Sequence, residues 1–336
     1  MRIVLDLLGT DKAPYPELKG AQLFLKENPN CFLYLVGTKD LKGEVKPSDK
    51  VKFIEAEDRV FSDEKPSDVL KTKKNSTIAI GLNLLKEGKA DVFFSAGNTG
   101  AVLAYSIKIL GRLKGVKRPA ICALFPTEKN YCAVLDVGAN ADSKPIFLYQ
   151  FGVMGKIFVE EVMGIKNPRV ALLSIGEERT KGNELIMKAK EIFERDKNLN
   201  FIGFIEGNEI LRGKADVVVT DGFTGNSLLK FGEGLVEFTY DFFSGYIKKS
   251  IKNQIGFYLM KNVFKSFLKK LSYEELGGAP LLGINGSVFI GHGRSSEIAI
   301  KNALKSALKY SDLSVGLKIE KSLIEYEDVN LETHKF

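Results

Sequence analysis

The alternation of short apolar runs with longer amphipathic segments is the feature that most constrains the fold of this chain. Runs rich in Val, Ile and Phe predict strands at 2–7, 31–36, 51–56, 91–95, 120–125, 131–136, 170–174, 201–205, 216–220 and 287–290. Helical periodicity predicts helices at 15–26, 76–86, 99–110, 144–163, 182–197, 226–246 and 297–309. This order predicts an α/β fold, with helices on both faces of a mainly parallel sheet.

Nothing in the sequence divides the chain cleanly, because it has no internal repeat, low-complexity tract or Pro/Ser-rich linker. With 336 residues and 44% apolar content, we expect residues 1–336 to form a single domain around a sizeable core. One segment, about 238–272, departs from the alternation because it is helical, aromatic and rich in lysine. We predict two helices with a turn near Gly256, which project as an insertion.

Positive charge is concentrated in this same segment. The formal net charge of the chain is +7, and residues 238–270 hold seven lysines but one acidic residue, Asp241. A nucleic-acid enzyme would more often spread its basic residues along a groove. We therefore expect one basic patch with one anionic partner, and no nucleic acid.

The cysteines and histidines argue against a metal site. Cys31, Cys122 and Cys132 each lie inside an apolar run, where core packing is the expected role, and only His292 and His334 could add imidazole ligands. We expect no metal and no cofactor. The N-terminus does not resemble a signal peptide, and no apolar run approaches the roughly 18 to 20 residues of a membrane span, so we expect a cytoplasmic protein.

Gly- and Asn-rich loops follow several of the predicted strands. In a parallel sheet, strand ends and the N-termini of the next helices meet at one edge, where backbone N–H groups and helix dipoles favour an anion. Segment 95–100 (SAGNTG) places Gly97, Asn98 and Thr99 at this edge. Capping and ligand contact are both open for Asn98 and Thr99, but two glycines around a pair of donors favour an anion site.

Three further loops have the same character, at 135–140, 174–183 and 220–226. Their candidate residues, with the lysine one turn beyond the last loop, are Asp136, Asn140, Glu177, Lys181, Asn183, Asp221, Thr224, Gly225, Asn226 and Lys230. Near the two ends of the chain, Asp11 follows the first strand and His292 lies between two glycines. For His292 a general base, a phosphate donor and a turn residue bonded to backbone are all open. Helix capping alone does not explain four such loops after four strands.

Several motifs that would indicate other chemistry are missing. The sequence has no P-loop lysine motif, no Gly-x-Ser-x-Gly nucleophile elbow and no Gly-x-Gly-x-x-Gly fingerprint at the first helix. Kinase, serine hydrolase and ordinary dehydrogenase functions are therefore disfavoured.

Taken in order, the loop segments resemble the bacterial phosphate acyltransferases of phospholipid synthesis, the PlsX family. The resemblance spans nearly the whole chain and is carried by 6–14 (DLLGTDKAP), 95–101 (SAGNTGA), 135–140 (LDVGAN), 175–178 (IGEE), 181–183 (KGN), 206–208 (EGN), 216–226 (DVVVTDGFTGN) and 277–283 (GGAPLLG). The family's opening usually reads Gly-Gly-Asp-His, but Thr10 replaces the second glycine here and Lys12 replaces the histidine. A catalytic role for a histidine at that position cannot be carried over, and Lys12 would add positive charge beside the anion site.

The resemblance implies transfer of a long acyl chain from acyl carrier protein to inorganic phosphate, which yields an acyl phosphate. It implies a three-layer α/β/α fold similar to isopropylmalate dehydrogenase or phosphotransacetylase. It also implies a homodimer, peripheral attachment to the anionic inner face of the membrane, and a downstream glycerol-3-phosphate acyltransferase as a further partner.

The chemistry fits loops that lack a Ser or Cys nucleophile, because phosphate is itself the nucleophile. The enzyme must hold an anion against a thioester carbonyl and stabilise the oxyanion that forms. We assign catalytic roles to Lys181, Asp136, Glu177 and Asp221, with the lysine neutralising charge and the carboxylates orienting donors. The expected phosphate or substrate contacts are Asp11, Gly97, Asn98, Thr99, Asn140, Asn183, Thr224, Gly225, Asn226, Lys230 and His292.

The basic insertion has two interpretations that the sequence leaves open. Apolar residues alternate with lysines at helical spacing, as in a helix that lies in a membrane interface, and the expected membrane contacts are Ile251, Ile255, Phe257 and Leu259. The other interpretation is a hairpin that packs in a dimer with a solvated lysine face. The same lysines could also dock an acidic carrier protein.

Three rival functions are weighed against this one. A phosphotransacetylase acting on short acyl-CoA would use a similar fold, but would not need an amphipathic insertion. A metal-dependent decarboxylating dehydrogenase would need an Asp triad and a nicotinamide site, neither of which is evident. A non-catalytic, membrane-docked scaffold for acyl carriers would have no use for paired Glu and Lys residues at an anion site.

Overall fold

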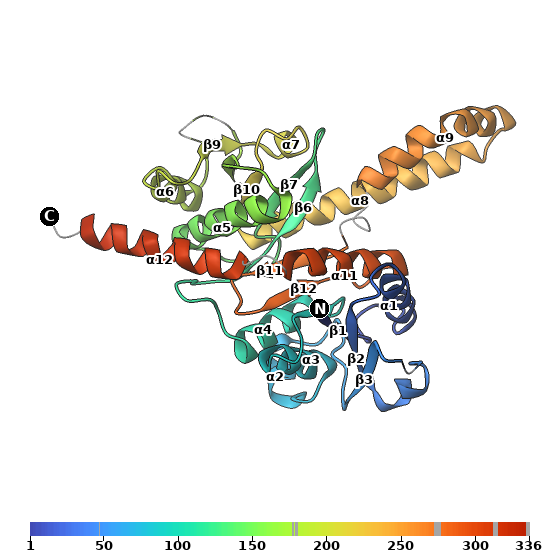
Figure 1. Cartoon of the computed structure of the whole chain (residues 1–336). Helices are drawn as coiled ribbons and strands as arrows, with labels where there is room; N and C mark the ends of the chain where they lie inside the picture. Colours follow the sequence, from blue (N-terminus) through green and yellow to red (C-terminus); the bar gives the residue numbers. More distant parts are fainter. Residues whose placement is uncertain (47, 177, 179–180, 272–276, 312–314, 334–336) are drawn as a thin grey trace.

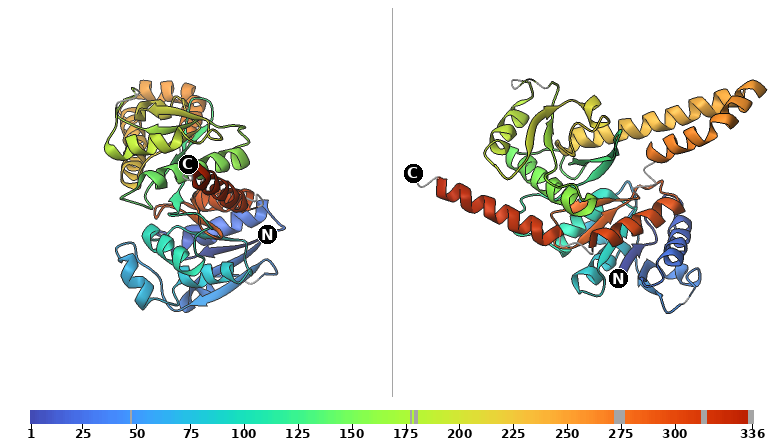
Figure 2. Two further views of the ribbon diagram at one scale, coloured as in Figure 1. Left: turned by 90° about the vertical axis from the view of Figure 1, so that its left-hand side faces the viewer. Right: turned by 45° about the horizontal axis from the view of Figure 1, so that its top comes forward.

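The computed structural model describes residues 1–336 except 47, 177, 179–180, 272–276, 312–314 and 334–336. Within the described residues, the strands form one sheet of seven strands and one of five, with helices packed on both (Figure 1). The two sheets lie at opposite ends of the body, and a long helical hairpin extends from it to one side (Figures 1 and 2).

The larger sheet has the strand order β3-β2-β1-β4-β12-β11-β5. Its parallel part consists of β1 (Arg2–Asp6), β2 (Phe32–Thr38), β3 (Val51–Ala56), β4 (Val92–Ser95) and β12 (Ser287–Ile290). Two strands pair in the antiparallel sense at one edge, β11 (Ala279–Leu282) and β5 (Ala120–Ile121). All four residues of β4 are buried, as expected for a parallel strand covered by helices on both faces.

The smaller sheet has the order β6-β7-β10-β8-β9. Its parallel strands are β7 (Tyr131–Leu135), β10 (Val217–Val219), β8 (Val170–Leu173) and β9 (Phe201–Ile205), and β6 (Ala123–Pro126) pairs antiparallel with β7. The predicted strand 120–125 therefore divides between the two sheets. The division falls at Cys122, whose N–H donates to the carbonyl of Pro280 at 3.1 Å.

Helices cover both faces of the larger sheet. On one face, α1 (Tyr15–Glu27) packs against α11 (Glu297–Ser311). A Cβ at Gly20 would lie 2.6 Å from the side chain of Ile300, so glycine permits this close packing. The other face carries α3 (Thr77–Lys86), α4 (Thr99–Ile109) and α2 (Pro66–Thr72).

The smaller sheet rests on α5 (Pro145–Phe158), which continues into the π-helical turn η2 (Val159–Met163). Against α5 pack α6 (Glu184–Phe193) and α12 (Val315–Thr333). One apolar cluster includes Leu5 of β1, Met154 of α5 and Val219 of β10, so the two sheets share a common core. Two short helices, η1 (Lys39–Gly43) and α7 (Gly207–Ile210), lie in connections.

The insertion predicted at about 238–272 is a helical hairpin that projects from the body (Figure 2). It consists of α8 (Gly222–Ile247) and α9 (Ile251–Leu271). The turn lies between residues 247 and 251, so the predicted turn at Gly256 is wrong. Gly256 lies inside α9 with open space around it, and a single glycine lowers helix stability without ending the helix.

Several elements were not predicted from the sequence, namely the short helices η1, α2 and α7, strand β11 and helix α12. Strand β11 lies in a segment of glycines and a proline that is typical of a loop, yet it pairs with β12 and β5. Helix α12 buries Val315, Ile319 and Leu323, which recur at the four-residue spacing of one helix face. That spacing was a signal for this helix.

Candidate functional site

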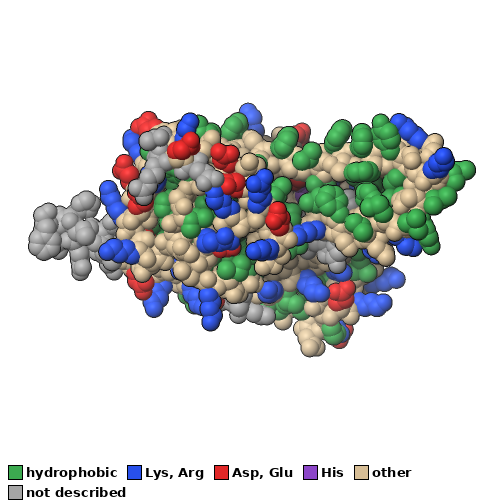
Figure 3. Space-filling model, turned by 90° about the horizontal axis from the view of Figure 1, so that it is seen from above, with side chains coloured by type: hydrophobic (Ala, Val, Ile, Leu, Met, Phe, Trp, Pro, Cys, Tyr) green, Lys and Arg blue, Asp and Glu red, His purple; other side chains and the backbone are tan. Residues whose placement is uncertain are grey.

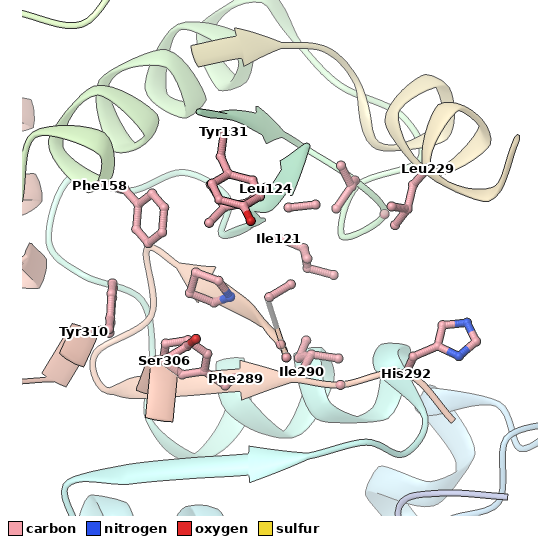
Figure 4. A pocket seen from close by; sticks show the side chains of 18 of the residues that line it. Ile121, Leu124, Tyr131, Phe158, Leu229, Phe289, Ile290, His292, Ser306 and Tyr310 are labelled. Carbon is pink, nitrogen blue, oxygen red and sulfur yellow. The ribbon is translucent and has the colours of Figure 1, made fainter. Parts of the chain in front are cut away.

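A cavity of about 740 Å³ lies between the two sheets (Figure 4). Its lining comes from both halves of the fold, and His292 and Leu229 lie at the opposite end from Phe158 and Tyr310. Lys230, Glu233 and His292 lie at one end, and the remainder is mainly apolar, with Asn130, Ser306 and Lys309 as polar members. The apolar lining includes Ile121, Leu124, Tyr131, Phe158, Phe289 and Tyr310.

The polar end is centred on Lys230, His292 and Glu233. The Nζ atom of Lys230 lies 2.8 Å from Nε2 of His292 and 2.8 Å from Oε2 of Glu233. Nε2 of His292 lies 3.7 Å from the same carboxylate oxygen. Helix α8 supplies the lysine and the glutamate one turn apart, and the loop after β12 supplies the histidine.

The hydrogen bonds of His292 favour an anion at this end. Its Nδ1 accepts from the backbone N–H of Arg294 at 3.1 Å, so the neutral ring carries its proton on Nε2. That proton faces the amino group of Lys230. An anionic oxygen can satisfy these two facing donors by accepting from both.

The electrostatics of His292 keep its ring neutral near pH 7. Burial lowers the pKa of His292 below its ordinary 6.5, and the positive charge of Lys230 lowers it further, whereas Glu233 acts in the opposite direction. A neutral ring with its proton on Nε2 acts as a hydrogen-bond donor, because Nδ1 is occupied by the N–H of Arg294.

Glu233 was missed in the sequence analysis. Its side chain is 16% exposed and lines the cavity. The available signal was its position three residues after Lys230, which places both side chains on one face of a helix.

Asp136 holds the neighbouring loop together from a fully buried position. Its carboxylate accepts from the backbone N–H groups of Ile121, Gly138, Ala139 and Asn140, and from the side-chain amide of Asn140, at 2.7–3.2 Å. Burial raises the pKa of Asp136, and these donors oppose the rise. Asp136 thus orients a loop beside the cavity and does not line the cavity itself.

Asn140 has a structural role in the same loop. Its amide donates to the carbonyl of Pro119 at 2.8 Å as well as to Asp136, and its carbonyl accepts from Gly222. With both amide hydrogens used inside the protein, the structure gives Asn140 a part in the architecture and not the phosphate contact that we predicted.

The N-terminus of α8 packs tightly on this loop. A Cβ at Gly225 would lie 1.9 Å from the carbonyl oxygen of Asp136, and one at Gly222 would lie 2.5 Å from that of Asn140. Only glycine permits this approach, which brings Asn226 beside Gly138 at the cavity. Gly225 therefore acts through packing.

Asp221 is the N-cap of α8. Its carboxylate accepts from the backbone N–H of Thr224 at 2.9 Å and from the hydroxyl of Thr224 at 2.7 Å. The predicted loop 220–226 is therefore largely the first turn of the helix. Asp221 and Thr224 bond to each other and stay outside the cavity lining, whereas Asn226 and Lys230 belong to it.

Asn98 has a capping role at α4. Its Oδ1 accepts from Ala101 N–H at 2.9 Å, and its Nδ2 donates to the carbonyls of Phe61, Ser62 and Glu64. These bonds use both amide hydrogens, so the side chain has no donor left for phosphate. Thr99, the next residue, is exposed and lines the cavity.

Three loops meet beside His292. The backbone N–H of Asp11 donates to the carbonyl of Gly293 at 2.7 Å, which joins the first loop to the last. A Cβ at Gly9 would lie 2.8 Å from the backbone nitrogen of Gly97, so these loops also touch. The structure places Asp11 and Gly97 behind the polar end, outside its lining.

Thr10, one of the two departures from the family's usual opening, is held in place by hydrogen bonds to Glu17. Its N–H and hydroxyl donate to the buried carboxylate of Glu17 at 2.7 and 3.1 Å. Burial raises the pKa of Glu17 from 4.5 to about 7. Glu17 thereby supports the loop that contacts Gly293.

The described residues of the predicted loop 174–183 do not line the cavity. Lys181 is exposed outside the lining, and Asn183 caps α6 by accepting from Ile186 N–H at 3.0 Å. Glu177 lies outside the described residues. The catalytic role of Lys181 remains a prediction.

The described residues contain no cluster of three or more His, Cys, Asp or Glu side chains suited to a metal ion. Cys122 and Cys132 are fully buried, and burial raises the pKa of both thiols, which makes them poor nucleophiles.

The hairpin exposes many apolar side chains. Figure 3 shows hydrophobic groups along its surface together with lysines near its tip. Ile251, Ile255 and Leu259 are 75%, 57% and 77% exposed, whereas Phe257 is half-buried against Phe264, with ring centroids 5.3 Å apart. Phe257 therefore packs inside the hairpin, contrary to its predicted membrane contact. In the described part of the chain no helix is long and apolar enough to span a membrane.

Comparison with known proteins finds relatives that match nearly the whole chain. Residues 1–317 match the family model described as fatty acid synthesis protein. A protein of Halothermothrix orenii named phosphate acyltransferase is 46% identical over 91% of this chain and 94% of its own length. A second protein of that name, from Dictyoglomus turgidum, is 43% identical over 98% of this chain and 99% of its own.

The fold also has solved counterparts. A phosphotransacetylase from Streptococcus pyogenes superposes with a TM-score of 0.58 over 92% of this chain and 94% of that protein, at 16% identity. The predicted three-layer α/β fold is confirmed, with its strands in two sheets instead of one. The predicted enzyme class, an acyltransferase, is confirmed by the named relatives. The chain belongs to the fatty acid synthesis protein family.

Proposed function

We propose that this enzyme transfers an acyl group from a thioester to inorganic phosphate. The observation that carries the proposal is a single cavity with two chemically different ends. One end has the facing donors Lys230 and His292, and the rest is lined mainly by apolar side chains, with Asn130, Ser306 and Lys309 among them. A substrate with an anionic reacting partner and a long apolar tail suits such a cavity.

Phosphate would bind at the polar end. Lys230 and the Nε2–H of His292 would each donate to a phosphate oxygen, and Thr99 and Asn226 add neutral donors from the N-terminal turns of two helices. Glu233 would hold Lys230 in place through their 2.8 Å contact. Lys181, Asp11 and the caps Asn98, Asn183 and Asp221 are not needed for this arrangement.

The acyl chain would lie among the apolar residues with its carbonyl carbon at the polar end. A phosphate oxygen attacks this carbon, the C–O bond forms, and the C–S bond breaks. The proton of hydrogen phosphate passes to the leaving thiolate, which departs as the thiol, while the Nε2–H of His292 keeps donating to the phosphate. Two reactants held in one cavity avoid the entropic cost of their encounter, and fixed donors stabilise the oxyanion.

The acyl donor in this proposal is acyl carrier protein, and the product serves phospholipid synthesis. The exposed side chains of Lys12 and Arg294 lie in the two loops that meet beside His292. Basic groups there suit an acidic carrier. An acyl-CoA donor, as in a phosphotransacetylase, is the second candidate.

The α8–α9 hairpin would attach the enzyme to an anionic membrane surface. Support comes from the exposed Ile251, Ile255 and Leu259 on a helix that also carries lysines. Each lysine near an anionic surface adds about 1 kcal/mol. A second copy of the chain is the expected partner along α8, where Phe223, Phe231 and Phe238 are each at least 66% exposed.

The experiment is to incubate the protein with phosphate and a long-chain acyl thioester, and to trap acyl phosphate with hydroxylamine. Carrier-protein and CoA thioesters are compared at equal concentration. A hydroxamate that requires phosphate supports acyl transfer, and the faster donor identifies the carrier. No hydroxamate from either donor contradicts the proposal.

A further inference from the structure

We propose that Phe158 and Tyr310 form the end wall of the acyl site and set the longest acyl chain that the enzyme accepts. This inference rests on the proposed function, because it assumes that the cavity holds an acyl chain. It assigns a specificity role to residues that take no part in the chemistry.

The position of the two rings is the first observation. In Figure 4 the side chains of Phe158 and Tyr310 stand at the end of the cavity away from His292, and both line it. Their ring centroids are 6.0 Å apart. An acyl chain that starts at the polar end therefore runs toward these rings.

The wall is rigid because three elements build it. Phe158 ends α5, Tyr310 lies on α11, and the ring of Phe289 on β12 meets Tyr310 edge to face at 5.3 Å. All three side chains are at most 8% exposed. Close-packed interiors adapt little to added volume, so a longer chain cannot displace them easily.

A wall of this kind gives a predictable dependence on chain length. Each methylene that enters the apolar part of the cavity should raise kcat/KM by about fourfold. Once the chain end reaches the rings, a further methylene has no place. The value of kcat/KM should then fall by at least about tenfold for each further methylene.

Two substitutions should shift this limit in opposite directions. Phe158→Ala removes one ring of the wall, and we expect the preferred chain to become longer, with at least about a tenfold gain in kcat/KM for the next longer chains relative to the original optimum. Ser306→Leu adds bulk beside Phe289, one turn before Tyr310 on α11, and we expect shorter chains to be preferred.

Phe151 provides a matched control. It is fully buried on the same helix as Phe158, two turns earlier, and it does not line the cavity. Phe151→Ala loses a comparable ring from the core, so it should lower stability without changing chain preference. Phe158→Leu and Phe151→Leu repeat the comparison with milder changes in case an alanine variant does not fold.

The measurement is kcat/KM for a series of saturated acyl thioesters that differ by two methylene groups. Opposite shifts for Phe158→Ala and Ser306→Leu, with none for Phe151→Ala, support the wall. If the Phe158 and Ser306 variants are active but keep the wild-type optimum of chain length, the end-wall proposal is overturned while acyl transfer still stands. A wild-type protein that makes no acyl phosphate from any member overturns the proposed function.

Discussion

The amino group of Lys230 lies 2.8 Å from Nε2 of His292, although 62 positions separate the two residues in the chain. Helix α8, which begins after the smaller sheet, carries the lysine, and the loop after β12 of the larger sheet carries the histidine. The polar end of the cavity therefore exists only where the two halves of the fold meet. Its chemistry depends on their packing as well as on the residues themselves.

Lys230→Ala should lower kcat/KM by roughly 100-fold, the scale expected when a donor to the transition state is lost. The measurement is the initial rate at subsaturating phosphate. Lys181→Ala is the comparison: the catalytic role predicted for Lys181 would give a loss of roughly tenfold or more, whereas its position outside the cavity lining would leave the rate unchanged. An unchanged rate for Lys230→Ala would remove this lysine from the site.

His292 should govern the acid limb of the pH profile. Because burial and Lys230 lower the pKa of His292, its ring becomes protonated at a lower pH than that of an ordinary histidine. Activity should fall as the pH drops through that lowered pKa, and His292→Gln should remove the limb. Rates are measured at saturating phosphate, so that titration of free phosphate affects both proteins equally. An acid limb that persists in the variant would exclude His292 as its source.

Glu17→Gln should stabilise the protein at alkaline pH. The pKa of Glu17 is about 7 in the fold and 4.5 ordinarily, so the folded state binds more protons between these values and wild-type stability falls as pH rises through that window. Above pH 7, ionising buried Glu17 lowers the free energy of unfolding by on the order of 3 kcal/mol. The gain in Tm should therefore be larger at pH 8 than at pH 5.

Glu27→Gln on the same helix is the control with the opposite sign. Glu27 pairs with Lys301 at 3.1 Å, and this hydrogen bond lowers the pKa of Glu27. The bond between ionised Glu27 and Lys301 stabilises the fold above pH 4.5, and this stabilisation is lost as the pH falls through the lowered pKa of Glu27. Glu27→Gln should therefore lower the stability of the protein at pH 8. Equal effects of Glu17→Gln at both pH values would contradict a carboxyl that titrates near 7.

Ile255→Asp should weaken binding to anionic liposomes, because it places a charge on an exposed apolar position of α9. Phe257→Leu, at the half-buried neighbouring position, should leave binding largely intact. Sedimentation with liposomes measures binding, and size-exclusion chromatography checks that the oligomeric state is the same. Wild-type binding by Ile255→Asp would favour a hairpin used for packing between subunits.

Much of the fold could be predicted because periodicity is local. The buried run of β4 and the helix that follows it are visible in the sequence itself. The division of 120–125 between two sheets was not visible, because it depends on partners from β11 and β7 that lie far along the chain. Strand β11 was missed because its segment is rich in glycine and proline, which are typical of loops, and the strand forms through pairing with β12 and β5.

Of the predicted site residues, some line the cavity and others support the loops around it. Gly- and Asn-rich composition cannot separate a cap from a ligand contact, and Asn98, Asn183 and Asp221 are caps that support the loops from within. Lys230, Asn226, Thr99 and His292 do line the cavity, as expected of binding residues. The wall around Phe158 and Tyr310 could not be predicted, because only tertiary packing brings these rings together.

The most direct test of the central claim is to follow radiolabelled phosphate into an extractable acyl phosphate, using the full chain and a long-chain acyl thioester. The account predicts label in this product with wild-type protein, and roughly 100-fold slower labelling with Lys230→Ala under identical conditions. Labelling at the wild-type rate in the Lys230 variant, or no labelled product from wild-type protein with any acyl donor, would contradict it.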